Sequence, residues 1–177
     1  MLVLERITDV KATVLSKLVE LYTEAFPAEE RREISQLREL IEHESDMFFN
    51  AVYWEGELAG LFVYWNMGSF YYLEHLAVLA EKRNRKIGQH ILDWVKEHLT
   101  GIRLLEVEPA ETEMAVRRIH YYERNGYHVL DKHYRQPSYV KGGAEFPLWV
   151  MGNETDLPAA VLQAHVQTIK AKVYYRE

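Results

Sequence analysis

The sequence predicts a mixed α/β fold in which helices cover a central sheet of six to seven strands, with an additional helix at the C-terminus. Two kinds of segment alternate along the chain: β-branched and aromatic runs, and runs whose apolar residues recur every three or four positions. Glycine and proline separate them. The length of 177 residues, with 48% hydrophobic and 27% charged residues, fits one globular domain over 1–177.

The first third predicts one strand, two helices and the start of a meander. Alternating residues over 2–7 indicate a strand, and an apolar face over 14–26 indicates a helix that ends at Pro27. A second helix is expected over 34–41. The charged stretch between the helices is interpreted as a solvated helix start or, alternatively, as part of a substrate loop.

The middle of the chain predicts an antiparallel meander. Glu55-Gly56 separates two aromatic and β-branched runs, 47–54 and 57–65, which is typical of a hairpin. Gly68 and Ser69 then turn the chain into a third strand over 70–79.

Helices and strands alternate in the remainder, with a left-handed cap at Asn125-Gly126 and a long loop around Pro137, Gly142 and Gly143. The expected elements are a helix over 87–99, a strand over 102–108, a helix over 112–124, strands over 127–134 and 145–151, and a helix over 157–173.

Composition excludes several kinds of function. The chain has no cysteine, which excludes disulfides, thiolate ligands and a cysteine nucleophile. A net charge of −6 argues against nucleic-acid binding. The 8 histidines form no H-E-x-x-H pair, and no G-x-S-x-G elbow is present, so we expect neither a metal nor a serine nucleophile. No apolar run reaches the roughly 20 residues that span a bilayer, so we expect a cytoplasmic protein with no membrane partner.

The segment FYYLEHLAVLAEKRNRKIGQHIL carries the most chemical information, because a strand leads through a basic loop into a helix. Arg83, Arg85 and Lys86 gather at the helix start, and Gly88 permits close approach of a ligand. The unpaired N–H groups of a helix N-terminus bind phosphates. A basic loop in this position is also compatible with simple surface solvation.

This segment resembles the acetyl-CoA-binding motif of the GNAT superfamily, a strand ending in L-A-V followed by R-x-x-G-x-G/A. Arg83, Lys86 and Gly88 occupy its fixed places, with Lys86 where the family usually has its first glycine. The resemblance implies that the strand end binds the pantetheine arm and that the loop and helix start surround the pyrophosphate. The residues concerned are Leu76, Ala77, Val78, Arg83, Asn84, Arg85, Lys86, Ile87, Gly88 and Gln89.

A second segment, YYERNGYHV from Tyr121 to Val129, is similar to the family's F-Y-E-K-x-G-F stretch. Together the two motifs and the chain between them cover residues 70 to about 134. The family often has asparagine seven residues before its tyrosine, and here Ala115 takes that place.

The resemblance implies a role for two side chains in transfer to an amine. Glu74 matches the glutamate of the I-E-D-L-x-V form and is expected to accept the amine proton, directly or through water. The alternative interpretation is an ion-paired strand residue, and His75 is expected to face the opposite side of the strand. Tyr122 takes the place of the tyrosine that protonates the CoA thiolate, or is an ordinary packed tyrosine.

We therefore expect an N-acetyltransferase that moves the acetyl group of acetyl-CoA to a primary amine of a small or peptide acceptor by direct attack. The Val78 N–H is expected to bind the thioester carbonyl, and the amine is expected to enter beside the first two helices. The alternative is a non-catalytic acyl-CoA-binding or sensor protein of the same fold. A phosphate-binding nucleotide module is disfavoured because no P-loop pattern is present. A homodimer is an open expectation of the resemblance.

Overall fold

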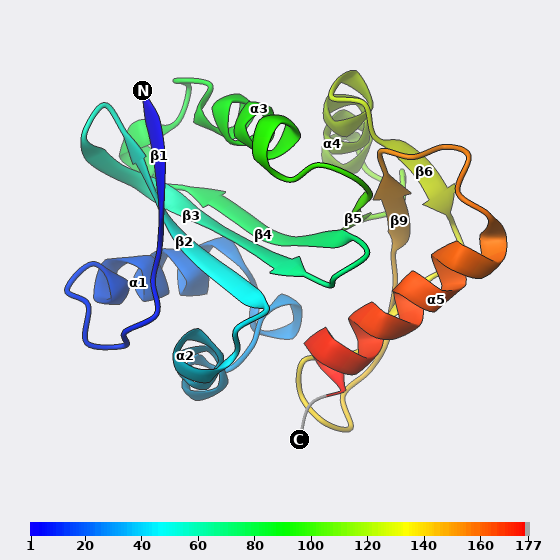
Figure 1. Ribbon diagram of the computed structural model, residues 1–177, viewed down its shortest axis with the longest axis horizontal. Coiled ribbons are helices and arrows are strands. Elements are labelled where there is room, and N and C mark those ends of the chain that lie inside the picture. Colours follow the sequence, from blue (N-terminus) through cyan, green and yellow to red (C-terminus); the bar gives the residue numbers. More distant parts are fainter. Residues whose placement is uncertain (176–177) are drawn as a thin grey trace. The chain divides into compact units, whose positions relative to one another are not determined.

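The computed structural model describes residues 1–175 and contains a seven-stranded mixed sheet in the order β1-β2-β3-β4-β5-β9-β6 (Figure 1). The chain forms two compact units, residues 1–66 with 74–100, and residues 67–73 with the chain from Gly101 onward. Strand β4, Tyr71–Val78, contributes to both. The seven strands and their flanking helices confirm the predicted fold class.

The strands of the first unit form the predicted meander. β1 (Leu2–Arg6) pairs antiparallel with β2 (Met47–Trp54), and β2 pairs antiparallel with β3 (Glu57–Asn66). Glu55 and Gly56 connect β2 and β3 with φ values of 51° and 81°. Two consecutive left-handed residues give the connection the twist that a tight hairpin requires.

Helices cover both faces of the sheet in the first unit. α1 (Leu15–Ala25) packs on β3 and α2 (Ile34–His43) packs on β2, whereas α3 (Ile87–His98) contacts β1 and lies on the other side (Figure 1). Each helix is amphipathic, and in α1 the buried face comprises Leu15, Leu18, Leu21 and Tyr22. Short 3-10 turns, Ala28–Glu30 and Ala80–Lys82, lie in the connections that follow α1 and β4.

The second unit contains the parallel pairing. Tyr71–Leu73 of β4 pairs parallel with β5 (Arg103–Val107), and β9 (Trp149–Gly152) pairs antiparallel with both β5 and β6 (His128–Asp131). α4 (Glu113–Arg124) packs on β5. α5 (Ala159–Ile169) is the predicted C-terminal helix, and it continues as a π-helical turn over Lys170–Tyr174.

The prediction of a single strand over 145–151 is wrong, because two separate strands occupy this range. β8 (Phe146–Pro147) pairs with β7 (Arg135–Gln136) in a separate two-stranded sheet, and β9 begins only at Trp149. Pro147 has no N–H to donate to a ladder, and the N–H of Leu148 donates to the carbonyl of Tyr134 at 3.1 Å. The chain therefore changes sheets at this point. None of the helices within residues 1–175 is long and apolar enough to cross a membrane.

Candidate functional site

The end of β4 is held tightly against β3. The N–H of Leu79 donates to the carbonyl of Ala59 at 2.7 Å. A side chain on Gly60 would place its Cβ 2.2 Å from the carbonyl oxygen of Ala77, so only glycine fits there. Leu76 and Val78 remain half-buried. Gly60, which was not recognised in the sequence, thus fixes the backbone that is expected to bind the pantetheine arm.

The basic loop leads into α3 through left-handed backbone. Arg83, Asn84 and Arg85 are exposed, and Asn84 and Lys86 have φ values of 66° and 58°. Lys86 directly precedes α3 and adopts the left-handed conformation at the place where the family has glycine. The substitution therefore changes the side chain but keeps a glycine-like backbone.

The first turn of α3 has the properties of an anion-binding site. No side chain caps it and no acidic residue lies in it. The N–H groups of this turn have no partner within the helix, and the helix dipole places partial positive charge beside them. Together with three exposed cations before the helix, this arrangement suits a ligand with several phosphates.

Ion pairs anchor the loop that precedes this helix. Lys82 pairs with Glu57 at the start of β3, and Lys17 of α1 lies 3.6 Å from Glu81. A cavity of about 340 Å³ lies between α1 and the loop, with Arg83 among its lining residues. The basic loop before α3 therefore borders an open space next to the first helix.

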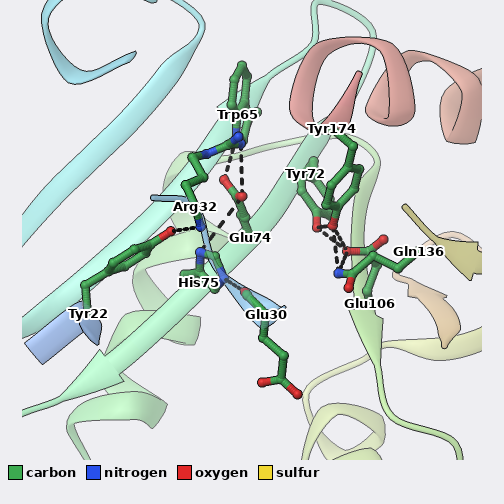
Figure 2. Close-up of polar contacts among 10 residues, drawn as sticks. All are labelled: Tyr22, Glu30, Arg32, Trp65, Tyr72, Glu74, His75, Glu106, Gln136 and Tyr174. Atoms are coloured by element: carbon green, nitrogen blue, oxygen red, sulfur yellow. Dashed lines mark hydrogen bonds and ion pairs between the residues drawn. The ribbon is translucent and has the colours of Figure 1, made fainter. Parts of the chain in front are cut away.

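Glu74 lies in a buried polar cluster (Figure 2). Its carboxylate accepts a hydrogen bond from Trp65 Nε1 at 2.7 Å and another from Arg32 at 3.2 Å. The Arg32 and Glu74 side chains are each 1% exposed, while the Glu74 residue as a whole is half-buried because part of its main chain is accessible. The ion pair of the alternative interpretation is therefore present.

His75 lies in the same cluster as Glu74, contrary to the expectation that it faces the opposite side. Its Nδ1 atom is 3.9 Å from Glu74 Oε2, and its Nε2 atom is 3.0 Å from the carbonyl oxygen of Glu30 (Figure 2). The ring also packs against Tyr22 and Phe26. The side chains of these neighbouring residues therefore both reach the cluster. Burial lowers the pKa of His75, and burial together with the nearby Glu74 charge raises the pKa of Tyr22.

Arg32 is the residue of this cluster that sequence reasoning missed. It belongs to the charged stretch between α1 and α2, which was interpreted as a solvated helix start or as part of a substrate loop, and it is 1% exposed. Its main-chain N–H donates to the Tyr22 hydroxyl at 2.9 Å, and its guanidinium lies 5.6 Å from the centre of the Trp65 ring. Arg32 thus attaches the connection between the first two helices to β4. The only sequence signal is its place among acidic neighbours.

Tyr122 lies in the second unit, near the end of α4. Its ring packs edge-on against Tyr121 and Tyr127, with ring centres 5.7 and 6.0 Å away. The residue keeps part of its surface exposed, and burial of the rest raises the pKa of its phenol. The predicted left-handed cap at Asn125-Gly126 is confirmed, because Gly126 has a φ of 89° and the carbonyl of Tyr122 accepts the N–H groups of Asn125 and Tyr127.

The site residues are therefore distributed between the two units. Glu74 and the residues predicted to bind acetyl-CoA, from Leu76 to Gln89, lie in the first unit, and Tyr122 lies in the second. Ala115 is buried in the first turn of α4, where its N–H donates to Thr112 Oγ1 at 3.0 Å. Among residues 1–175, no group of three or more His, Asp or Glu side chains is arranged to hold a metal.

Comparison with known proteins identifies relatives of this chain. A sequence model of the acetyltransferase (GNAT) family matches residues 15–127. A structure from Bacteroides thetaiotaomicron, described as an acetyltransferase of the GNAT family, is 31% identical, covers 99% of both chains and superposes with a TM-score of 0.91. No curated protein sequence matches significantly.

More distant structures share the fold. An aminoglycoside 6'-N-acetyltransferase complexed with coenzyme A is 17% identical, covers 88% of this chain and 98% of its own, and has a TM-score of 0.58. Naa50 from Arabidopsis thaliana, in complex with the bisubstrate analogue CoA-Ac-MVNAL, is 19% identical, covers 86% and 98%, and has a TM-score of 0.56. At these identities the similarity concerns the fold alone.

Proposed function

Because the chain belongs to the GNAT acetyltransferase family, we propose that it transfers the acetyl group of acetyl-CoA to a primary amine of a small acceptor. The amine nitrogen attacks the thioester carbonyl, the C–S bond breaks, the nitrogen loses a proton and the CoA thiolate gains one. The observation that carries the proposal is the uncapped start of α3, preceded by three exposed cations. Residues 1–177 act as one acetyltransferase domain.

In this proposal the first unit binds acetyl-CoA. Main-chain groups of Leu76, Ala77 and Val78 pair with the pantetheine arm, and the Val78 N–H stabilises the thioester oxygen as negative charge develops on it. Residues 83–89 surround the pyrophosphate. The support is the left-handed backbone at Asn84 and Lys86, which turns the loop into the helix N-terminus.

Glu74 is the proposed proton acceptor. Because its side chain is 1% exposed, we favour transfer from the amine through water rather than direct contact. Glu74→Gln keeps the size of the side chain and removes its basicity. If Glu74 is the base, the variant loses the acidic limb of the pH–rate profile. A residue that acts only through its ion pair would lower the rate without changing the shape of that profile.

Tyr122 is the proposed proton donor to the CoA thiolate. The phenol is protonated at neutral pH and so can donate a proton, while burial, which raises its pKa, makes it a weaker acid. Tyr122→Phe is expected to lower kcat roughly a hundredfold while leaving the Kd for acetyl-CoA within about twofold. Tyr121→Phe, on the same helix and also half-buried, is the matched control and keeps its kcat. An unchanged kcat in Tyr122→Phe would remove its acid role.

The experiment that tests the function has two steps. Binding of acetyl-CoA is measured by calorimetry, and thiol release is then followed with a panel of diamines, aminoglycosides, amino acids and peptides. Binding with turnover on at least one amine supports the enzyme. Binding without turnover on any amine favours the alternative, a non-catalytic acyl-CoA-binding or sensor protein, and failure to bind acetyl-CoA contradicts both.

The acceptor, assembly and location stay predictions. The family relatives include an enzyme named for aminoglycosides and a complex with a peptide-containing analogue, so small-molecule and peptide amines are both included in the panel. We propose that the acceptor is a small amine and that the protein uses no metal, nucleic-acid or membrane partner. We also propose that it forms a homodimer and is cytoplasmic. Sedimentation of the purified protein tests the dimer.

A further inference from the structure

A second buried polar cluster lies in the second unit, centred on Glu106 of β5 (Figure 2). Three donors converge on its Oε1 atom: the Tyr72 hydroxyl, the Tyr174 hydroxyl at 2.6 Å and Gln136 Nε2 at 3.2 Å. Gln136 Nε2 also lies 2.9 Å from the Tyr174 hydroxyl. The donors come from β4, from the π-helical turn after α5 and from β7, so the fold brings distant segments to one carboxylate.

The other oxygen of this carboxylate, Oε2, differs from Oε1 in its hydrogen bonding. Glu106 Oε2 is buried and has no hydrogen-bond partner within the described part of the chain, and the same holds for the hydroxyl of Tyr134. Tyr134 lies beside the Glu106 carboxyl, although the two groups do not form a hydrogen bond of normal geometry. An unsatisfied buried polar atom costs about 1–3 kcal/mol, so this arrangement is not explained by stability.

Burial raises the pKa of Glu106, and the surrounding hydroxyl groups oppose this shift. The Glu106 residue as a whole is nevertheless half-buried rather than inaccessible. A buried carboxylate of this kind is stabilised in its ionised form by a cation placed at the unsatisfied oxygen.

A cavity borders the cluster at Tyr174. This cavity of about 320 Å³ is lined by Tyr174 and by the loop from Pro137 to Glu145. Tyr174 is the last residue of the π-helical turn, and its ring also packs against Tyr139 at 4.8 Å between centres. π-helical turns are rare and frequently mark functional sites. Tyr174 therefore belongs both to the hydrogen-bond network of Glu106 and to the wall of the cavity.

We propose that Glu106 Oε2 and the tyrosines around it form a binding site for the ammonium group of an alkylamine that enters through this cavity. An ammonium group has three N–H donors, which match the unpaired carboxylate oxygen and the Tyr134 hydroxyl, and the faces of the tyrosine rings favour a cation. The identification of this amine as the acetyl acceptor rests on the proposed function. The existence of the binding site does not depend on the proposed function.

The test uses n-butylammonium chloride as the probe, with no acetyl-CoA present. Titration is followed by the NMR resonance of the Gln136 side-chain amide, which lies 3.2 Å from Glu106 Oε1. The wild-type resonance is expected to shift and saturate, whereas Glu106→Gln is expected to bind at least about tenfold more weakly. Glu108→Gln, an exposed carboxylate two residues further along, is the matched control and binds as the wild type does.

Two further probes separate the forces involved. n-Butanol has the same chain without charge and is expected not to bind, while tetramethylammonium, a cation without N–H donors, is expected to bind more weakly than n-butylammonium. Equal binding of n-butylammonium by wild type and Glu106→Gln would overturn the proposal. Because no acetyl-CoA is used, this failure is distinguishable from failure of the proposed function.

A pH titration of the wild-type protein tests the same site without any variant. The groups that face Glu106 are Tyr72, Tyr134, Gln136 and Tyr174, and its register partner on β9 is the apolar Val150. None of these is a cation, whereas Lys170 Nζ lies 5.4 Å from the centre of the Tyr134 ring and Lys141 and Glu145 line the cavity. Glu106 is the carboxylate among the groups at the proposed contact. Binding of n-butylammonium is expected to weaken as acidification protonates Glu106, and pH-independent binding would contradict the site.

Discussion

At the scale of single residues, two buried carboxylates of this chain differ in how their oxygens are satisfied. Glu74 accepts hydrogen bonds on both oxygens, from Arg32 and Trp65, whereas Glu106 accepts all of its hydrogen bonds on one. A buried charge with an unpaired oxygen destabilises the fold, and such a feature persists at sites that bind ligands. The hydrogen bonds of Glu74 therefore stabilise both oxygens of its carboxylate, whereas those of Glu106 stabilise only one.

This difference predicts that Glu106→Gln stabilises the free protein. The folded-state pKa of Glu106 is raised, so the folded protein binds this proton more tightly than the unfolded chain does. The stability from this group is complete below the ordinary carboxyl value of 4.5 and is lost as the pH rises through the folded pKa. At pH 8 the variant is expected to unfold with a free energy higher by about 1 kcal/mol.

Urea unfolding of wild type and variant at pH 8 and pH 4.5 measures this effect. The difference is expected to shrink at the lower pH, because a larger fraction of Glu106 is protonated there in both the folded and the unfolded wild-type protein. Glu108→Gln, which changes an exposed carboxylate, serves as the control and shows little difference at either pH. A loss of stability at pH 8 would mean that Glu106 Oε2 has a structural partner.

Single residues were also the hardest feature to predict from sequence. Arg32 and Glu74 are 42 residues apart, and nothing in the local charge pattern of the first selects the second as its partner. The same holds for Glu106, whose donors Tyr72 and Tyr174 are 34 and 68 residues away. Motif spacing indicated Glu74 and Tyr122 as functional candidates, but only the fold identifies what holds or surrounds them.

At the scale of elements, the end of β4 depends on Gly60 of β3. Gly60→Ala places a methyl group 2.2 Å from the Ala77 carbonyl and 3.1 Å from the Val78 Cα, and both neighbours are main-chain atoms that cannot rotate away. The backbone must shift, and we expect a loss of about 1–3 kcal/mol in stability. The Kd for acetyl-CoA should rise as well, because the shifted atoms belong to the proposed pantetheine contact.

Thermal unfolding and calorimetry with acetyl-CoA measure these two effects separately. Ala59→Gly, one residue earlier on the same strand, is the control: it removes a methyl group instead of adding one and leaves the contact with Ala77 intact. Normal affinity for acetyl-CoA in Gly60→Ala would show that the β4 backbone at Ala77 does not contribute to binding.

The start of α3 gives a second prediction at this scale. Lys86 adopts a left-handed conformation that costs a non-glycine residue about 1 kcal/mol or more. Part of this cost is offset because glycine is more flexible in the unfolded chain, so Lys86→Gly is expected to raise the melting temperature by roughly 1–3 °C. Arg85→Gly removes the same charge at a position without positive φ and is expected to lower it. A lower melting temperature for Lys86→Gly would contradict the inferred backbone strain at Lys86.

Helices and strands were predictable where they depend on a local sequence pattern. The prediction failed for strands whose partners are distant in the sequence. The apolar periodicity of α1, α3 and α4 places these helices within about two residues of their observed bounds, because a helix satisfies its own hydrogen bonds. The strands near the C-terminus depend on partners elsewhere: Pro147 pairs with Arg135, while Trp149 pairs with Val107. Residue type alone does not reveal a change of sheet between two such neighbours.

At the scale of the whole molecule, the family fold was predictable because its two sequence motifs flank the central elements. The matched family region, residues 15–127, contains the first motif and all but the last two residues of the second, whereas the polar cluster around Glu106 also draws on Gln136 and Tyr174 beyond it. The residues proposed to bind acetyl-CoA come from the part of the chain shared with the family. The proposed amine site uses residues outside that part, which is why motif comparison did not identify it.

Binding of acetyl-CoA to the folded state predicts a stabilisation of the whole protein. At a concentration one hundred times Kd, a ligand that binds only the folded state adds about 2.7 kcal/mol, which corresponds to a rise of roughly 5–10 °C in the melting temperature. Arg83→Ala removes one exposed cation of the loop and is expected to weaken binding about tenfold, which halves this stabilisation at the same concentration. Arg38→Ala, an exposed arginine on α2, should keep the full shift. An equal reduction in both variants would trace the effect to net charge rather than to the loop before α3.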